Sequence, residues 1–458
     1  MFRQTFRSLA VRNFRLFVMG QTFSVTGTWM MLVAQDWLVL SLSGDSATQL
    51  GLVTALQFAP VLLLTLHGGT LADRWDKRRL LGAANAVAGL LAALVFLVAV
   101  GPGLRLWHIY VFATALGLLT AVEAPTRMAL VGEMVGVELL PNASALSGAY
   151  FNVARMVGPA LAGLLIGRLG AASVFLLNAV SYGATVASVA LMRECELRPA
   201  LPHTDRRRRN SGVTAGLRYV LRRSDLLLPL ALLAIVGTFG FNFQLTLPVL
   251  AKAEFGTSPA SFGLLSSALA AGSLGAAFVT TARVRRPTAG VVIGASVLFG
   301  LCEIASGLAP TFALTLVALT ATGFGAGYFA QATNHRVQLG SDGRYRGRVL
   351  ALYVVIFQGS TPLGALPLGR LVEAEGPRSG LLAGGLITLA ASAVALMCVR
   401  RSAPPVYRLT GAVGDGLNTL HGRHPGHVRR SVLRGTQRAG GAAGRRGRGG
   451  LGGRLRGR

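Results

Sequence analysis

Charged residues are scarce in this chain of 458 residues. Asp, Glu, Lys and Arg together make up only 14% of the sequence, whereas hydrophobic residues make up 52%. A water-soluble protein of this length needs a charged surface, so the composition excludes an ordinary soluble fold. The windows 80–100 and 171–192 contain no charge at all, and each is long enough to cross a bilayer core of about 30 Å.

Cysteine is scarce as well, and catalytic motifs are missing. Only Cys195, Cys302 and Cys398 occur, without a CxxC pair, which excludes a disulfide framework and a cysteine-based metal site. The sequence contains no Walker A loop, so it does not encode ATP hydrolysis, and no nucleophile–base constellation is apparent. We therefore expect no cofactor, no metal and no enzymatic activity.

The apolar segments present predict twelve membrane-spanning helices and an all-α membrane fold. The predicted spans are 15–40, 49–71, 79–100, 107–130, 143–167, 171–192, 227–250, 260–281, 288–308, 312–334, 349–371 and 379–400. Basic residues concentrate in every second connection, as the positive-inside rule requires. This alternation predicts a multi-pass protein of the cell membrane with both termini in the cytoplasm.

The net charge of +28 could indicate nucleic-acid binding, but its distribution argues for membrane lipids as the partner. The basic residues lie in short segments between the spans, in the connection that contains Arg206–Arg209, and in the segment beyond Ser402. We interpret the connection as a solvated linker against anionic headgroups, with a regulatory or nucleic-acid site as the alternative. The Gly/Arg-rich tail cannot build a core and predicts disorder, with headgroup adhesion, an unselected extension or RGG-like binding as open roles.

Short sequence matches between the two parts of the chain predict two related halves. Gly27-Thr28-Trp29 corresponds to Gly237-Thr238-Phe239, and Gly167-Arg168-Leu169 corresponds to Gly369-Arg370-Leu371. We therefore expect six-helix halves at 1–192 and 226–400, a basic cytoplasmic linker at 193–225 and a tail at 401–458. Such halves are typical of transporters, with the substrate site near the midplane between them.

A glycine, an acid and a basic cluster follow the second predicted span in the sequence GGTLADRWDKRRLL. The residues concerned are Gly69, Asp73, Arg74, Lys77, Arg78 and Arg79. The alternative interpretation is a generic positive stop between two spans. The pattern resembles the signature loop between helices 2 and 3 of the major facilitator superfamily, although Asp76 stands where many members have glycine. The resemblance implies that Asp73 acts in a conformational switch against the start of the eleventh span, 346–353.

The fifth predicted span contains small residues and a proline at short intervals. Its sequence ARMVGPALAGLLIG includes Arg155, Gly158, Pro159 and Gly163. Small residues allow helices to pack closely in a membrane, which is the ordinary interpretation. The segment also resembles the antiporter motif of exporters in the same superfamily, although Ala154 replaces one of its glycines.

The segments 123–163 and 345–369 resemble the enterobactin-exporter and macrolide-efflux branch of the major facilitators, and the resemblance covers residues 10–400 approximately. It implies a secondary transporter that exports an organic small molecule, such as a drug-like compound or a siderophore, in exchange for protons. Nutrient uptake and a non-transporting sensor or scaffold are the alternatives. We expect a monomer with a small-molecule substrate.

Charges within the spans need a reason, because each costs about 2.5–3.5 kcal/mol at the bilayer centre. Glu123 and Arg127 are spaced i,i+4 and predict an ion pair near the cytoplasmic end of their span. Asp36 is either a protonatable cavity residue or an interfacial carboxylate, and we take it as the candidate proton carrier. Arg155 is the candidate gating charge, with Glu123 as its expected partner, and Glu303 is expected at the interface.

Overall fold

The computed structural model describes residues 6–197, 212–281, 286–343 and 345–402, and throughout these ranges the only regular elements are helices. The first part of the chain forms η1 (Arg7–Ala10), α2 (Arg12–Ser43), α3 (Ala47–Arg74), α4 (Lys77–Val100), α5 (Leu106–Leu169) and α6 (Ala171–Ala190). The second part forms α8 (Ser224–Phe239), α9 (Phe243–Val249), η4 (Leu250–Glu254), α10 (Pro259–Thr281), α11 (Ala289–Leu308), α12 (Phe312–Gly340), α13 (Arg346–Glu375) and α14 (Ser379–Ser402). The short helices η2 (Glu194–Glu196) and α7 (Gly212–Leu221) lie in the connection between the two parts.

Side chains at the helix starts explain where several helices begin. The Ser46 hydroxyl accepts a hydrogen bond from the backbone N–H of Gln49 and caps α3. The Asp76 carboxylate accepts from the backbone N–H of Arg79 at 2.7 Å and caps α4. These caps satisfy backbone N–H groups that a helix start leaves unpaired. The aspartate that replaces a glycine in the loop motif therefore has a local structural role.

Ten of the described helices are long and apolar enough to cross a membrane, as is the segment Ser224–Glu254 that contains α8, α9 and η4, and one of the ten helices crosses twice. The helix α5 has 64 residues, and Gly136 breaks it with a φ of 72°. Only glycine adopts that backbone conformation readily, so the chain reverses at this point and α5 has two arms, 106–135 and 137–169. The fold is therefore that of an all-α membrane protein with twelve crossings, as the sequence predicts.

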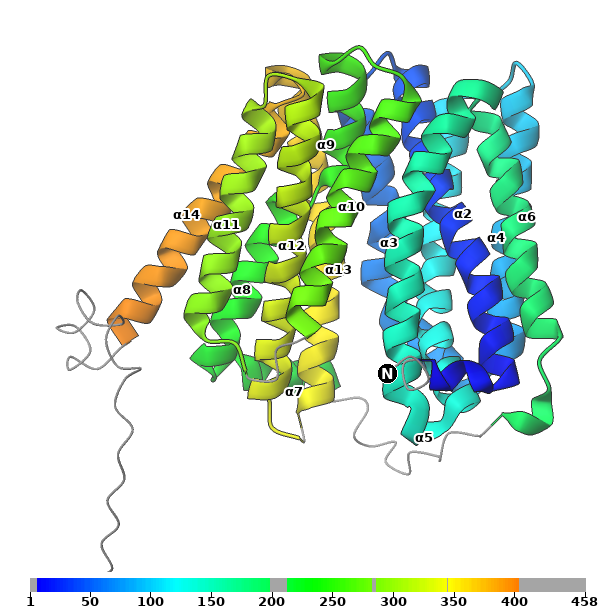
Figure 1. Cartoon of the computed structure of the whole chain (residues 1–458), viewed down its shortest axis with the longest axis horizontal. Helices are drawn as coiled ribbons and strands as arrows, with labels where there is room; N and C mark the ends of the chain where they lie inside the picture. The colour runs from blue at the N-terminus through cyan, green and yellow to red at the C-terminus, as the bar shows by residue number, and fades with distance from the viewer. Residues whose placement is uncertain (1–5, 198–211, 282–285, 344, 403–458) are drawn as a thin grey trace, which may run out of the picture. The chain divides into compact units, whose positions relative to one another are not determined.

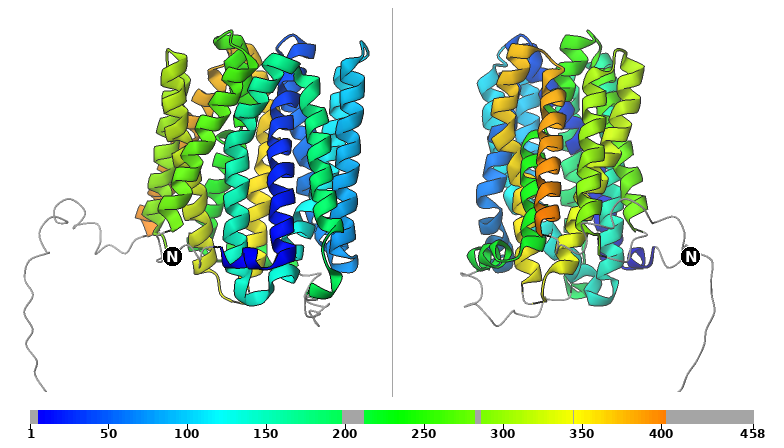
Figure 2. Two further views of the ribbon diagram at one scale, coloured as in Figure 1. Left: turned by 45° about the vertical axis from the view of Figure 1, so that its right-hand side comes forward. Right: turned by 90° about the vertical axis from the view of Figure 1, so that its left-hand side faces the viewer.

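The helices run roughly parallel to one another in two groups (Figure 1). In the first group α2 packs against α5 and α6, and α4 packs against α6; in the second, α11 packs against α12 and α14, and α8 packs against α13. Helix α2 begins and α14 ends at the lower end of the bundle in Figure 1, which we call the terminal face, and the opposite end is the far face. Two further views show the same arrangement of helices (Figure 2).

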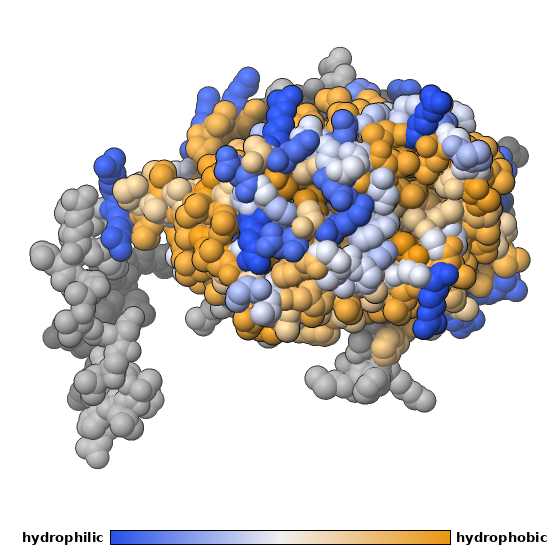
Figure 3. Space-filling model, turned by 90° about the horizontal axis from the view of Figure 1, so that it is seen from above, coloured by the Kyte–Doolittle hydropathy of each residue, from blue (hydrophilic) through white to orange (hydrophobic). Residues whose placement is uncertain are grey.

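The surface of the bundle separates polar from apolar residues. Viewed from above, hydrophilic residues lie over the middle of the far face, and hydrophobic residues surround them (Figure 3). Large apolar side chains that are more than half exposed include Leu97, Val180, Phe278 and Val317. Such a contiguous apolar surface is the lipid-facing side of a membrane protein. The predicted basic run Arg206–Arg209 and the predicted tail from residue 403 onward lie outside the described residues.

Candidate functional site

The loop motif after α3 is anchored to the first helix group at the terminal face. Lys77 pairs with Glu133 of α5 at 2.7 Å. Arg78 donates to the carbonyl of Met192 at 2.9 Å and also pairs with Glu194. Asp73 is exposed one turn beyond Gly69. The basic cluster therefore fastens α4 to α5 and to the end of α6.

Two glycines near the terminal ends of α3 and α13 border open space within the described part of the chain. A Cβ atom added at Gly69 of α3 would meet no atom within 4 Å, and the same holds at Gly347 in the first turn of α13. Near the far face, the same two helices are in tight contact. A Cβ added at Gly51 would lie 2.5 Å from the carbonyl oxygen of Ala365, and one at Gly369 would lie 2.8 Å from that of Ala47. The helices α3 and α13 therefore meet toward the far face.

An acidic side chain of α13 caps the start of α3 across the two helix groups. Glu373 accepts hydrogen bonds from the backbone N–H of Thr48 at 2.9 Å and from the Ser46 hydroxyl at 3.0 Å. A negative charge at a helix start is favourable because of the helix dipole. Lys252 of η4 adds a second contact between the groups, since it pairs with Asp45 at 2.5 Å and lies over the Trp37 ring.

These far-face contacts predict a modest shift in conformation when Glu373 is changed. Glu373→Gln removes the charge but preserves the shape, so it is expected to favour opening of the far face about two- to fivefold, a loss of roughly 0.3–1 kcal/mol. The measurement is the labelling rate of a cysteine placed at Ala47, which is buried in the first turn of α3, in a cysteine-free background. Glu375→Gln, two residues further along α13, is the matched control. An unchanged rate in Glu373→Gln would exclude this cap from the closure.

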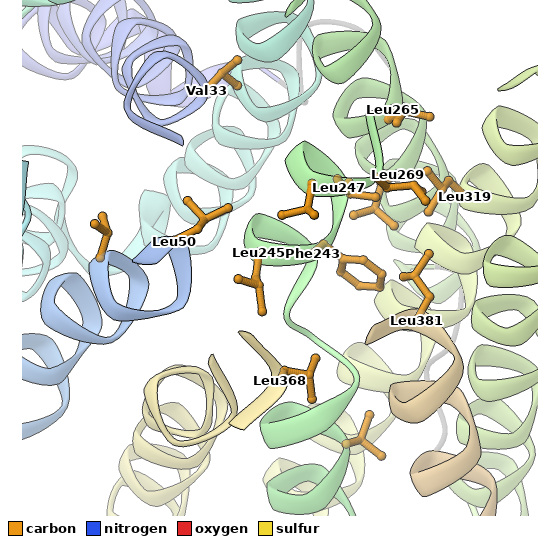
Figure 4. Close-up of a cluster of buried hydrophobic side chains, with 14 of the residues drawn as sticks. Val33, Leu50, Phe243, Leu245, Leu247, Leu265, Leu269, Leu319, Leu368 and Leu381 are labelled. Carbon is orange, nitrogen blue, oxygen red and sulfur yellow. The ribbon is translucent and has the colours of Figure 1, made fainter. Parts of the chain in front are cut away.

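Apolar side chains seal the space between the helix groups toward the far face. Figure 4 shows three side chains of α9: Leu245 lies on the side of Leu50 of α3 and Leu368 of α13, Leu247 lies toward Leu269 of α10, and Phe243 points toward Leu381 of α14. The three α9 side chains and the two facing leucines belong to one buried cluster, which also contains Val33 of α2. Burial of each such side chain contributes about 1.5–3 kcal/mol where the alternative is water, so a water-filled opening here is costly.

The small-residue motif on the second arm of α5 lies on two interfaces. A Cβ at Gly158 would lie 2.7 Å from Cβ of Trp29 in α2, which is a contact inside the first group. A Cβ at Gly163 would lie 2.6 Å from Cα of Ala260 in α10, and Gly263 of α10 packs against the carbonyl of Pro159. The Ser267 hydroxyl of α10 also donates to the carbonyl of Met156 at 2.7 Å. Gly163 and Pro159 therefore form part of the contact between the two groups.

Two charged side chains form the expected pair on the first arm of α5. The Arg127 guanidinium lies 3.4 Å from the Glu123 carboxylate, and another of its nitrogens donates to Gln21 Oε1 of α2 at 3.4 Å. Glu123 and Arg127 both lie in the half of this arm that is nearer to its terminal-face end. The pairing lowers the cost of holding both charges inside the membrane.

Arg155 on the second arm has an aromatic neighbour instead of the expected acidic one. Its guanidinium carbon lies 5.7 Å from the centroid of the Trp29 ring, and Trp29 in turn meets Phe151 edge to face. Within the described ranges no carboxylate lies within ion-pair distance of Arg155, so the pairing with Glu123 predicted from sequence is wrong. An Arg over a tryptophan face is held by a cation–π attraction that leaves its hydrogen bonds for another partner.

Asp36 lies in α2 within the part of the bundle that is closed toward the far face. Its side chain is only 6% exposed, and among the described residues no basic side chain lies within ion-pair distance of it. The preceding residue, Gln35, donates to Gln57 Oε1 of α3 at 2.9 Å. This burial is consistent with the protonatable residue proposed from the sequence, and the alternative of an interfacial carboxylate stays open.

Glu303 is also buried in the bundle, although it lies close to the end of α11. It is 1% exposed on α11, and its Oε2 atom has no hydrogen-bond partner within the described part of the chain. Helix α14 packs over this position, so distance to the helix end does not report exposure. The sequence analysis did not predict the contacts of Glu373, Asp45 and Lys252, because no local pattern indicates partners that are hundreds of residues apart.

The chain crosses the membrane twelve times in two packed groups of helices. The bundle is sealed toward one face and holds polar pairs between its helices. This combination is typical of a secondary membrane transporter. The family model described as transmembrane secretion effector matches residues 3–405. The chain belongs to this family of the major facilitator superfamily, whose members are transporters and not enzymes.

The curated relatives confirm the predicted branch. The multidrug efflux pump Tap of Mycobacterium tuberculosis is 28% identical over 399 residues, which is 83% of this chain and 92% of the relative. The enterobactin exporter EntS of Shigella boydii is 24% identical over 377 residues, 81% of this chain and 88% of the relative. A solved structure of a bacterial homologue of the lysosomal transporter Spinster matches with a TM-score of 0.68 at 13% identity and covers 85% of this chain and 96% of the other; this likeness concerns the fold.

Proposed function

We infer that this protein exports organic small molecules across the cell membrane, and we propose that it does so by proton antiport as a monomer. The observation that carries the transport mechanism is the difference between the two faces. The helix groups meet along α3 and α13 and along α5 and α10 toward the far face, while a Cβ added at Gly69 or Gly347 near the terminal face would meet no described atom within 4 Å. A bundle closed at one face and separable at the other is one of the two states that alternating access requires.

The proposed orientation places the terminal face in the cytoplasm, which makes this conformation inward-facing. The alternation of basic residues supports it, because Arg74, Lys77, Arg78 and Arg79 all lie at the terminal face. A reporter enzyme that is active only in the cytoplasm is expected to be active when fused after Arg401. The same reporter fused at Gly256, in the far-face connection, is expected to be inactive. The reverse pattern would place the far face in the cytoplasm, and the proposed direction of transport would then be wrong.

The proposed halves, 1–192 and 226–400, move against each other as units around the substrate. We propose that the terminal ends of α3 and α13 close in the outward-facing state, and that Asp73 at the start of α13 holds them together there. Glu373 makes a contact of the same kind at the opposite ends of the same helices. Each state would then be held by a carboxylate of one helix at the start of the other, which gives two states of similar free energy.

The proposed substrates are drug-like compounds and siderophores, since relatives are named for multidrug efflux and for enterobactin export. The first helix group has an aromatic surface and a cation close together, at Trp29, Phe151 and Arg155. Such a surface suits aromatic molecules that carry polar or anionic groups. Cells that lack their own exporters and express this chain are expected to retain less ethidium or release more enterobactin than cells expressing Asp73→Asn. Equal levels of both compounds in the two strains would contradict export.

A further inference from the structure

We propose that Glu303 is a proton-binding site at a hinge in the second helix group, and that its proton holds the hinge in the far-face-closed state. This inference rests on the proposed proton antiport, and it makes Glu303 a second proton-binding group besides Asp36. It starts from the position of Glu303 on α11, a helix that packs against α12, α14 and α8.

The surroundings of Glu303 favour its neutral form. The side chain is 1% exposed, and Oε2 has no hydrogen-bond partner among the described residues. An ionised carboxylate accepts several hydrogen bonds, and a buried one without a cation or donors is costly enough that it takes up a proton instead. A neutral carboxyl group has one O–H to donate and needs only one acceptor.

The charged groups on the helices packed around Glu303 are committed elsewhere or distant along their helices. Arg378, directly before α14, donates to the carbonyls of Gly307 and Ala309 and pairs with Glu254. The other ionisable side chains on these helices are Asp225 of α8, Tyr328, His335 and Arg336 of α12, Cys302 of α11, and Cys398, Arg400 and Arg401 of α14. Asp225 pairs with Arg223 and Arg286, and Arg336 donates to the Pro287 carbonyl.

A backbone carbonyl near Glu303 belongs to a break in a membrane-spanning helix. Helix α8 ends at Phe239 and α9 begins at Phe243, so the break exposes carbonyl groups of the last turn of α8. The Asn242 side chain takes one of them, the carbonyl of Thr238, at 2.6 Å. A Cβ added at Gly384 of α14 would lie 2.6 Å from Glu303 Oε1 and 2.8 Å from the Phe239 carbonyl oxygen. The carboxyl group and the carbonyl therefore converge on the space that this glycine leaves.

The break connects Glu303 to the seal between the halves. Beyond the break, α9 inserts Phe243, Leu245 and Leu247 into the apolar cluster that closes the far face (Figure 4). The O–H of a protonated Glu303 can donate a hydrogen bond to the Phe239 carbonyl at the end of α8. An ionised Glu303 has no proton to donate and places a second acceptor beside that carbonyl. Loss of the proton thus destabilises the bent arrangement of α8 and α9, and with it the position of α9 in the seal.

Infrared spectroscopy of the full chain in lipid vesicles tests proton binding without a substrate. The spectrum at neutral pH is expected to contain the C=O stretch of a protonated carboxyl group that Glu303→Gln lacks. Asp36→Asn serves as the control for the other buried acid. Glu303→Asp keeps the carboxyl chemistry and is expected to show a shifted band. A Glu303→Gln spectrum identical to that of the wild-type protein in this region would overturn the proposal.

Transport by the same vesicles tests the link to coupling, with ethidium and enterobactin as probes. The Glu303→Gln variant is expected to exchange a probe when the pH is equal on both sides. Its accumulation of the probe under a pH gradient is expected to be at least tenfold lower than that of the wild type. Gradient-driven accumulation equal to the wild type would remove Glu303 from coupling. If the wild-type protein moves both probes without moving protons, the antiport itself fails, and the infrared result still decides whether Glu303 binds a proton.

Discussion

Replacing Gly163 by leucine is expected to abolish transport while leaving the protein folded in the membrane. In the far-face-closed state a Cβ at this position would lie 2.6 Å from both Cα of Ala260 and the carbonyl oxygen of Pro259. A leucine side chain extends much further, so it overpacks the contact between α5 and α10 at a cost of about 1–3 kcal/mol. The strain exists only when the halves meet at the far face, so the conformational equilibrium is expected to shift outward by about 5- to 150-fold.

The neighbouring turn of α5 provides the matched control. A Cβ added at Gly167 would meet nothing within 4 Å, and Gly167 precedes the end of the same helix by two residues. Gly167→Leu is therefore expected to transport as the wild type does. Distances between spin labels at Gly103 and Pro310, at the far face, are expected to lengthen only in Gly163→Leu. Normal export by Gly163→Leu would show that this interface does not open and close during transport.

Replacing Asp36 by asparagine is expected to uncouple export from the proton gradient. Asp36 is buried in this conformation, and among the described residues no cation lies within ion-pair distance, so its carboxyl group is suited to carry a proton. An asparagine cannot take up or release a proton, although it preserves the shape of the side chain. The variant is expected to exchange ethidium across vesicles at equal pH, while accumulation driven by a pH gradient falls by at least tenfold.

Glu123→Gln separates a proton carrier from a structural carboxylate. Glu123 has Arg127 as its partner at 3.4 Å, so loss of its charge leaves a partly buried arginine unpaired. Glu123→Gln is therefore expected to lower the amount of folded protein and both modes of transport together. If the Asp36 variant accumulates substrate normally under a gradient and only the Glu123 variant loses coupling, the proton-carrier role belongs to Glu123.

The spans were predictable because apolar length is a strong local signal. The prediction of two spans at 107–130 and 143–167 corresponds to the two arms of α5, and the chain reverses within the intervening segment at the single residue Gly136. The distance of Glu303 from the end of α11 suggested an interfacial side chain, but exposure depends on which helix covers that face. Here α14 covers it, and that packing is tertiary information.

The contacts between the two halves could not be predicted from the sequence. Glu373 and Thr48 are 325 residues apart, and neither lies in a recognisable motif. Gly163 was identified as part of a small-residue motif, but the sequence could not say that Ala260 is its neighbour. The partner of Arg155 was assigned wrongly because charge complementarity alone suggested Glu123, whereas the helix faces bring the Trp29 ring to the guanidinium.

The most direct test of proton-coupled export is to follow protons and substrate together in vesicles containing only this protein. A pH-sensitive dye inside the vesicles reports proton movement while ethidium, or enterobactin in a parallel sample, is supplied on the side of the terminal face. Substrate entering from that side is expected to drive protons in the opposite direction, and an imposed pH gradient is expected to concentrate substrate. Movement of both probes down their own gradients, with no proton movement and no response to pH, would contradict it.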